Sequence, residues 1–166
     1  MDKIILTTKL SIEDYVKINY HLLYRKWRFK LMTGIGIFML ISLLFTFDSF
    51  KEFPWVQLLL GLFLTVGQAI SVYFSAKKNY KSNGRISERI NYEFDRENIK
   101  VTGESFEAKS TWDKIYSVTE NKDWILIWQN QQVANVVPKR DFKEGELQAL
   151  KNIVSLHSKV INKLSK

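Results

Sequence analysis

The sequence predicts an α+β membrane protein in which a two-helix transmembrane hairpin precedes a small antiparallel β-meander domain with a C-terminal amphipathic helix. Two stretches, residues 31–47 and 53–76, contain no charged residue, and each approaches the length needed to cross a bilayer. Between residues 90 and 137 apolar residues alternate with polar ones, as in strands that bury one face. Near the end of the chain the apolar spacing changes to three and four, which is typical of an amphipathic helix.

The first uncharged stretch would extend roughly 25 Å as a helix, and the second roughly 36 Å. Because the first is short, we expect it to extend backward, with a re-entrant or interfacial helix as the alternative. Basic and aromatic residues flank the stretches and are expected to anchor them at the membrane surface: Arg25, Lys26, Trp27, Arg28 and Lys30 before the first span, and Lys77 and Lys78 after the second. The connecting residues 48–52 carry one lysine and two acids, so the positive-inside rule places both termini in the cytoplasm.

Residues 1–30 are expected to form a cytoplasmic strand and an amphipathic helix that leads into the membrane. Residues 3–9 fit a short strand. Ser11 then begins Ser-Ile-Glu-Asp, which resembles a capping box with Asp14 in the place of the usual Glu or Gln. Apolar residues at helical spacing from Ile12 onward predict a helix that runs into the first span. The many charges before Leu31 argue against a signal peptide.

The second span carries a row of polar and small residues at helical spacing: Gln57, Gly61, Thr65 and Gln68. Small residues let a partner helix approach closely, and glutamine amides can hydrogen bond across the contact. We therefore expect this face to pack within the hairpin or in a homo-oligomer. A path for solutes or ions is the other interpretation, but both stretches lack the ionisable residues that usually mark such paths.

A basic linker is expected over residues 77–89, followed by a cytoplasmic domain over residues 90–166. Alternation predicts short strands joined by tight turns near residues 90–94, 99–101, 106–112, 116–118, 124–128 and 133–137. An apolar stripe then predicts a helix over residues 143–165, formed by Leu147, Leu150, Val154, His157, Ile161 and Leu164. We expect this helix to cover the sheet, and a coiled-coil seam between protomers is the alternative.

The sequence carries no pattern typical of an enzyme, a cofactor site or a metal site. It has no cysteine and two histidines, which excludes thiolate metal sites and cysteine nucleophiles. Gly-rich phosphate loops and the Gly-x-Ser-x-Gly and His-Glu-x-x-His motifs are missing. The formal charge of +8 could suggest nucleic acid, but basic segments beside a bilayer with anionic headgroups explain it better. We expect no catalytic residue, no cofactor and no nucleic-acid partner.

Five residues of the predicted domain are candidates for contact with a partner: Trp112, Trp124, Trp128, Lys139 and Arg140. Tryptophan is enriched in interface hot spots, although tryptophans on strands are more often packed in a core. Lys139 and Arg140 precede the predicted helix, whose first N–H groups would favour an anion or a lipid headgroup. A solvated turn fixed by Pro138 and Phe142 is the alternative.

Several segments together resemble the YcxB-like membrane proteins of bacteria. They are Lys77-Lys78 after the second span, Ile-Asn-Tyr-Glu-Phe-Asp (90–95), Ile-Lys-Val-Thr-Gly (99–103), Ser-Thr-Trp-Asp-Lys-Ile (110–115) and Val-Pro-Lys-Arg-Asp-Phe (137–142). The resemblance implies a C-terminal pleckstrin-homology-like domain, a bacterial cytoplasmic membrane and no established catalytic activity. Many pleckstrin-homology domains bind inositol lipids through a basic first hairpin. Residues 95–98 here carry two acids and one arginine, which lowers the expectation of headgroup binding.

Two functions fit this reading. In the first, the chain is a non-enzymatic membrane protein whose cytoplasmic domain binds or scaffolds an unknown protein, or a second copy, at the inner membrane. The alternative is an immunity protein that neutralises a membrane-active toxin or bacteriocin through its hairpin. The row from Gln57 to Gln68 would then make the contact with the toxin.

Overall fold

The computed structural model describes residues 3–46 and 53–164, so the predicted connection over residues 48–52 and the last residue of the first predicted span lie outside the described residues. The chain divides into two compact units. One is built from residues 1–10 and 85–166, and the other from residues 11–84. The first strand therefore belongs with the C-terminal domain, and the hairpin is inserted between two strands of that domain.

The domain contains two four-stranded sheets. The first has the order β1–β2–β3–β4 and is antiparallel throughout, with β1 at Lys3–Thr8, β2 at Ile90–Asp95, β3 at Asn98–Thr102 and β4 at Glu107–Thr111. The second has the order β7–β6–β5–β8, with β5 at Ser117–Glu120, β6 at Trp124–Trp128, β7 at Ala134–Pro138 and β8 at Ile161–Lys163. The predicted antiparallel sheet region is confirmed, with β8 as a parallel addition beside β5.

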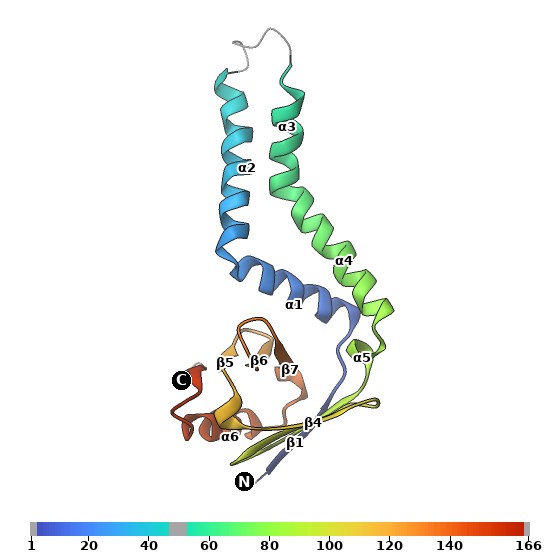
Figure 1. Ribbon diagram of the computed structural model, residues 1–166, viewed down its shortest axis with the longest axis vertical. Helices are drawn as coiled ribbons and strands as arrows, with labels where there is room; N and C mark the ends of the chain where they lie inside the picture. Colours follow the sequence, from blue (N-terminus) through green and yellow to red (C-terminus); the bar gives the residue numbers. More distant parts are fainter. Residues whose placement is uncertain (1–2, 47–52, 165–166) are drawn as a thin grey trace. The chain divides into compact units, whose positions relative to one another are not determined.

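Strand β1 pairs with β2 along its whole length, from Lys3 opposite Asp95 to Thr8 opposite Ile90. The two strands lie together although the complete hairpin separates them in sequence (Figure 1). Because Thr8 and Ile90 are partners, the connections from the domain to the inserted hairpin leave the sheet at the same end. Burial alternates along β1, so Ile4 and Leu6 enter the core and Ile5 faces outward with 53% of its surface exposed.

One apolar core joins the two sheets and the helix α6, Glu146–Ser155. Phe94 and Ile99 come from the first sheet, and Ile125 and Ile127 come from β6. The helix adds Leu150, Ile153 and Val154, each at least 94% buried. The helix therefore closes the core between the sheets, as expected of its apolar stripe.

The C-terminal helix is much shorter than the predicted range of residues 143–165. It begins after Gly145, whose φ of 81° places it in the left-handed region that glycine adopts without steric cost, and it ends at Ser155. The rest of the predicted stripe has other roles, because Ile161 lies in β8 and His157 stacks on Trp112 with ring centroids 5.7 Å apart. Residues Ile161–Lys163 therefore pair with β5 as a strand and do not continue the helix.

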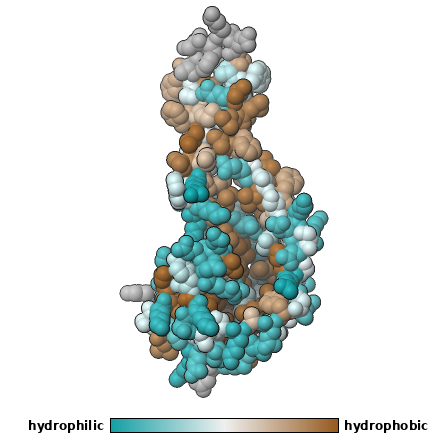
Figure 2. Space-filling view, in the orientation of Figure 1, coloured by the Kyte–Doolittle hydropathy of each residue, from teal (hydrophilic) through white to brown (hydrophobic). Residues whose placement is uncertain are grey.

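The inserted unit contains two long apolar helices that run side by side (Figure 1). The first, α2, is Trp27–Thr46, so the span extends backward as predicted. The second is continuous through α3 (Trp55–Leu62), a π-helical turn η2 (Phe63–Gly67) and α4 (Gln68–Ser82). The two apolar windows are only 17% and 6% buried, unlike core helices of soluble proteins, and apolar side chains gather on their surface (Figure 2).

Helix α1, Ile12–Arg25, precedes α2 and begins with the predicted capping box. The Ser11 hydroxyl accepts from the Asp14 N–H at 3.1 Å, and the Asp14 carboxylate accepts from the Ser11 N–H at 3.0 Å. The prediction of one helix running into the span is wrong, because Lys26 adopts an extended ψ of 120° and separates α1 from α2. Helix α1 instead packs on α4, where the Tyr20 hydroxyl donates to the Ala69 carbonyl at 2.9 Å.

The predicted linker over residues 77–89 is largely helical. Helix α4 continues to Ser82, and the short helix α5 covers Gly84–Ser87. The chain breaks at Asn83, which is extended, at the Ser-Asn-Gly sequence that favours a turn.

Candidate functional site

The three candidate tryptophans lie in the interior and not on the surface. Trp112, Trp124 and Trp128 are 0%, 6% and 3% exposed. The Trp112 indole N–H donates to the Asp95 carbonyl at 2.9 Å, and the Trp128 indole N–H donates to the Thr119 hydroxyl at 2.9 Å. Because each of these two indoles has its polar atom satisfied and its rings buried, packing explains them better than contact with a partner.

Lys139 is engaged in an ion cluster inside the domain. Its ammonium pairs with Glu120 Oε1, while Lys151 Nζ lies 2.9 Å from Glu120 Oε2. The Glu120 side chain is only 7% exposed, so two lysines compensate a carboxylate that burial would otherwise make costly. The cluster ties β5 to the turn after β7 and to α6. This geometry gives Lys139 a structural role.

Arg140 remains at the surface beside its neighbour. Its side chain is 57% exposed, and Nε lies 3.8 Å from Asp141 Oδ1. Lys139–Asp141 form a short 3-10 turn, η4, and α6 begins only at Glu146. The predicted anion contact at the helix start is therefore not assembled. At that start the Lys143 N–H donates to the Glu146 carboxylate at 2.8 Å.

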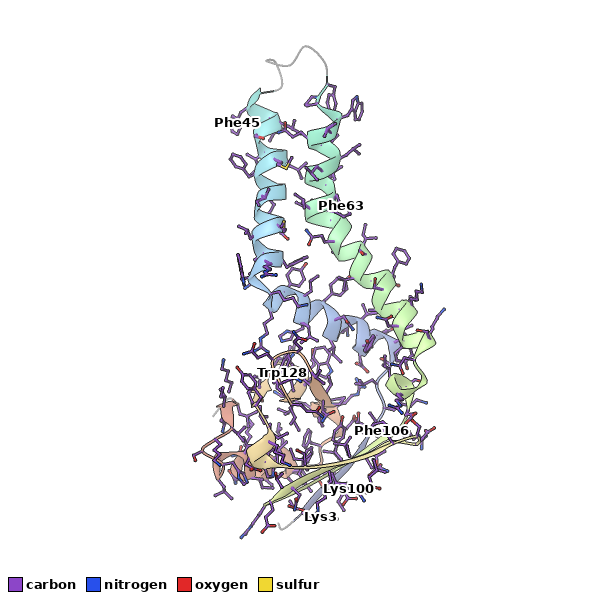
Figure 3. The ribbon with its side chains drawn as sticks, in the orientation of Figure 1. Lys3, Phe45, Phe63, Lys100, Phe106 and Trp128 are labelled. Atoms are coloured by element: carbon purple, nitrogen blue, oxygen red, sulfur yellow. The ribbon has the colours of Figure 1, made fainter. Side chains whose placement is uncertain are left out.

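The outer face of the first sheet carries alternating charges. Lys3 Nζ lies 2.6 Å from Glu93 Oε2, and Lys100 Nζ lies 3.0 Å from Glu107 Oε1; Figure 3 labels both lysines on this sheet. The hydrogen bond from Lys3 lowers the pKa of Glu93, and the hydrogen bond to Glu107 raises the pKa of Lys100. These pairs cross between neighbouring strands and mark a solvated face.

The first hairpin turn is built by an acid rather than by a cationic binding loop. Asp95 Oδ1 accepts from the N–H groups of Glu97 and Asn98 at 2.8 and 2.6 Å. Partial burial opposes ionisation of Asp95, but these backbone hydrogen bonds lower its pKa on balance. The acidic turn predicted over residues 95–98 is thus a rigid Asx turn.

Strand β5 takes part in the shortest strand pairing among the residues that the structure describes. Its partner β8 pairs over three residues, with Ser117 opposite Ile161, Val118 opposite Asn162 and Thr119 opposite Lys163. All three residues of β8 are exposed, and the Ile161 N–H reaches the Tyr116 carbonyl at 3.3 Å. Sequence reasoning missed this site because three residues are too few for an alternating pattern.

The polar row of the second span divides at the π-helical turn. Gln57 Nε2 donates to the Met39 carbonyl at 3.1 Å and to the Ser42 hydroxyl at 2.8 Å on α2. Gly61 lies against Leu40, so closely that an added Cβ would come within 2.8 Å of its side chain. Gln68 instead lies with the residues that join α1 to α2.

Thr65 and Gln68 both return hydrogen bonds to their own helix. The Thr65 hydroxyl donates to the Gly61 carbonyl at 2.8 Å, and Gln68 Nε2 donates to the Leu64 carbonyl at 3.0 Å. The outward sides of the hairpin are apolar, with Phe45 82% and Phe63 59% exposed (Figure 3). The row therefore makes contacts inside the hairpin, while large apolar side chains face outward.

The predicted interface anchors gather at two places in the inserted unit. Arg25, Lys26, Trp27, Arg28 and Lys30 surround the joint between α1 and α2 and are exposed. Lys77 and Lys78 lie in α4, where Lys77 Nζ is 5.1 Å from the Tyr73 ring centroid. Among the residues that the structure describes, no group of three or more His, Cys, Asp or Glu side chains could hold a metal ion.

Comparison with known proteins bears on the domain alone. Residues 94–154 match the model of the YcxB-like protein family. The resemblance predicted from the sequence is thus confirmed for residues 94–154, from the end of β2 into α6, which include the Trp112 and Lys139 motifs. No curated protein and no solved structure gives a significant match to the chain.

Proposed function

We propose that this YcxB-like chain is a non-enzymatic, two-pass membrane protein whose cytoplasmic domain is a binding or scaffolding module. The observation that carries the proposal is the β5 edge, which accepts a strand through only three exposed residues of β8. An extended peptide of a partner protein would replace β8 and add to the same edge. Backbone hydrogen bonds would supply affinity, as in other cases of strand addition.

The outer face of the first sheet and the β4 and β7 edges are less suited than β5 to accept a strand. The outer face of the first sheet is covered by the charge pairs of Lys3 and Lys100. The β4 edge carries Lys109 at its centre with an exposed side chain, a feature that discourages further strand pairing. The β7 edge ends at Pro138, which has no N–H to donate.

The strand order supports a pleckstrin-homology-like fold for the domain. Four strands form one sheet, the three successive strands β5, β6 and β7 form the second together with the short strand β8, and a helix closes the core. The positive-inside rule supports a cytoplasmic location, because basic residues flank the two spans at the ends from which the chain continues into the domain. The hairpin would hold the module at the bilayer and raise its local concentration there.

Capture of partners by the full-length protein tests this proposal. Tagged protein is recovered from gently solubilised native membranes as wild type, as Ile161→Pro and as the matched control Ile161→Val. Proline removes the N–H that reaches Tyr116 and weakens β8, whereas valine retains the strand. The proposal predicts that one partner is recovered in larger amount with Ile161→Pro and in unchanged amount with Ile161→Val. Equal recovery with all three proteins would contradict it.

The hairpin does not favour the immunity alternative. Gln57 and Gly61, which were expected to meet a toxin, contact α2 of the same chain. A toxin would have to replace these contacts or bind the outward apolar side. We therefore place the binding function on the domain.

A further inference from the structure

An open cleft of about 570 Å³ lies at the joint between α1 and α2. Two contacts fix its shape. The Tyr20 hydroxyl holds α1 to the Ala69 carbonyl of α4, and the rings of Tyr24 and Phe29 meet edge to face with centroids 5.0 Å apart. Phe29 is 5% exposed, so it anchors the start of α2 while the residues around it remain open.

Three cationic side chains line this cleft: Arg25, Lys26 and Arg28. All three residues are exposed, and the Arg28 guanidinium lies 5.9 Å from the centroid of the Trp27 ring. The sequence has no Asp or Glu from residue 15 to 47 or from residue 53 to 87. The segments that form the cleft therefore contribute positive charge with no carboxylate among them.

The other walls of the cleft are apolar, with one amide. Trp27, Phe29 and Met32 come from α2, and Gln68 comes from the first position of α4. Met32 is 44% and Trp27 is 67% exposed. The cleft thus presents cationic and amide groups that could bind a polar headgroup. It also presents an apolar wall that could contact a hydrocarbon chain.

We propose that this cleft binds one anionic phospholipid. The phosphate would lie against Lys26 and Arg28, because guanidinium and ammonium groups donate charge-assisted hydrogen bonds to phosphate oxygens. An acyl chain would follow Met32 along α2 into the bilayer. The site rests on the membrane-spanning hairpin of the proposed function, and it is independent of partner binding at β5.

Native mass spectrometry of the delipidated full-length protein in mild detergent tests the site. Phosphatidylglycerol and phosphatidylcholine with identical acyl chains are titrated separately, and inorganic phosphate is added as a competitor. One phosphatidylglycerol should bind in preference to phosphatidylcholine. Lys26→Gln and Arg28→Gln should each weaken its binding about fivefold, the value expected for one basic residue near an anionic surface. The control is Lys30→Gln, which removes the same charge from α2 outside the cleft and should change binding less than about twofold.

Three results would overturn the proposal: equal loss with Lys26→Gln and Lys30→Gln, equal binding of both lipids, or full displacement of the lipid by inorganic phosphate. Gln68→Leu provides a second variant without a change in charge, and it should weaken binding of phosphatidylglycerol if the amide contacts the phosphate. Extraction of native membranes with alkaline carbonate separates the two proposals. Release of the protein would refute the spanning hairpin itself, whereas retention without lipid preference would refute only the cleft.

Discussion

Truncating Leu6 in β1 should destabilise a domain whose other strands lie more than 80 positions further along the chain. Leu6 is 3% exposed and opposite Tyr92 of β2, whereas its neighbour Ile5 is 53% exposed. Leu→Ala in a packed core costs about 2–5 kcal/mol. A domain of this size has a total stability of about 5–14 kcal/mol, so Leu6→Ala would remove a large share, and Ile5→Ala is the matched surface control.

Hydrogen exchange of the full-length protein in detergent measures this effect locally. Leu6→Ala should accelerate exchange of the β2 amides at residues 90–95, because loss of β1 pairing opens that edge. Ile5→Ala should leave exchange there nearly unchanged. Equal acceleration by the two variants, or none with Leu6→Ala, would show that β1 is not part of the domain. It follows that a fragment starting at residue 85 lacks a structural strand, and that residues 3–10 must be joined to it.

Three further predictions concern the hairpin, the ion cluster and pH. Gly36→Ala should weaken packing of α2 on the π-helical turn η2 by about 1–3 kcal/mol, because its Cβ would lie 2.8 Å from Leu64 Cβ. Disulfide formation between cysteines introduced on the two long helices should fall, whereas Gly34→Ala, with open space around it, should not lower it. Glu120→Gln should destabilise the domain by about 3–5 kcal/mol, since it removes the buried carboxylate that pairs with Lys139 and Lys151. Urea unfolding followed by tryptophan fluorescence measures this loss, and an unchanged unfolding midpoint would contradict the stabilising role of the ion cluster. The Lys3 hydrogen bond lowers the pKa of Glu93 below its ordinary 4.5. The stabilisation of the folded domain by the Lys3–Glu93 pair is therefore present above pH 4.5 and is lost as the pH falls through the lowered pKa. Glu93→Gln should remove the contribution of this pair to the pH dependence of stability, and parallel pH profiles of variant and wild type would contradict the prediction.

Local patterns predicted much of the fold. The Ser11 capping box, the backward extension of the first span and the strands from Ile90 onward depend on neighbouring residues, and the sequence is sufficient to predict them. The break at Lys26 has no Gly or Pro to mark it, and the packing of α1 on α4 depends on residues far apart in the sequence, such as Tyr20 and Ala69. The early end of α6 likewise depends on a tertiary contact, the pairing of Ile161 with Ser117.

The candidate site was harder to predict than the fold. Alternation showed that Trp124 and Trp128 share one face of a strand, but it could not show whether that face is buried. The pairing of Lys139 with Glu120 joins segments from different parts of the domain, and no spacing rule predicts it. The basic cluster before the first span was predicted as an anchor, and the cleft became visible only with the joint at Lys26.

An engineered disulfide that holds β8 on β5 and can be reduced tests the binding module most directly. Ser117 and Ile161 are register partners on adjacent strands, at a separation that suits a disulfide. The natural chain has no cysteine, so Ser117→Cys with Ile161→Cys would form a single defined bond. Partner binding by the full-length double variant should be lost when the bond is formed and should return when it is reduced. Equal binding in the oxidised and reduced states would contradict docking at the β5 edge.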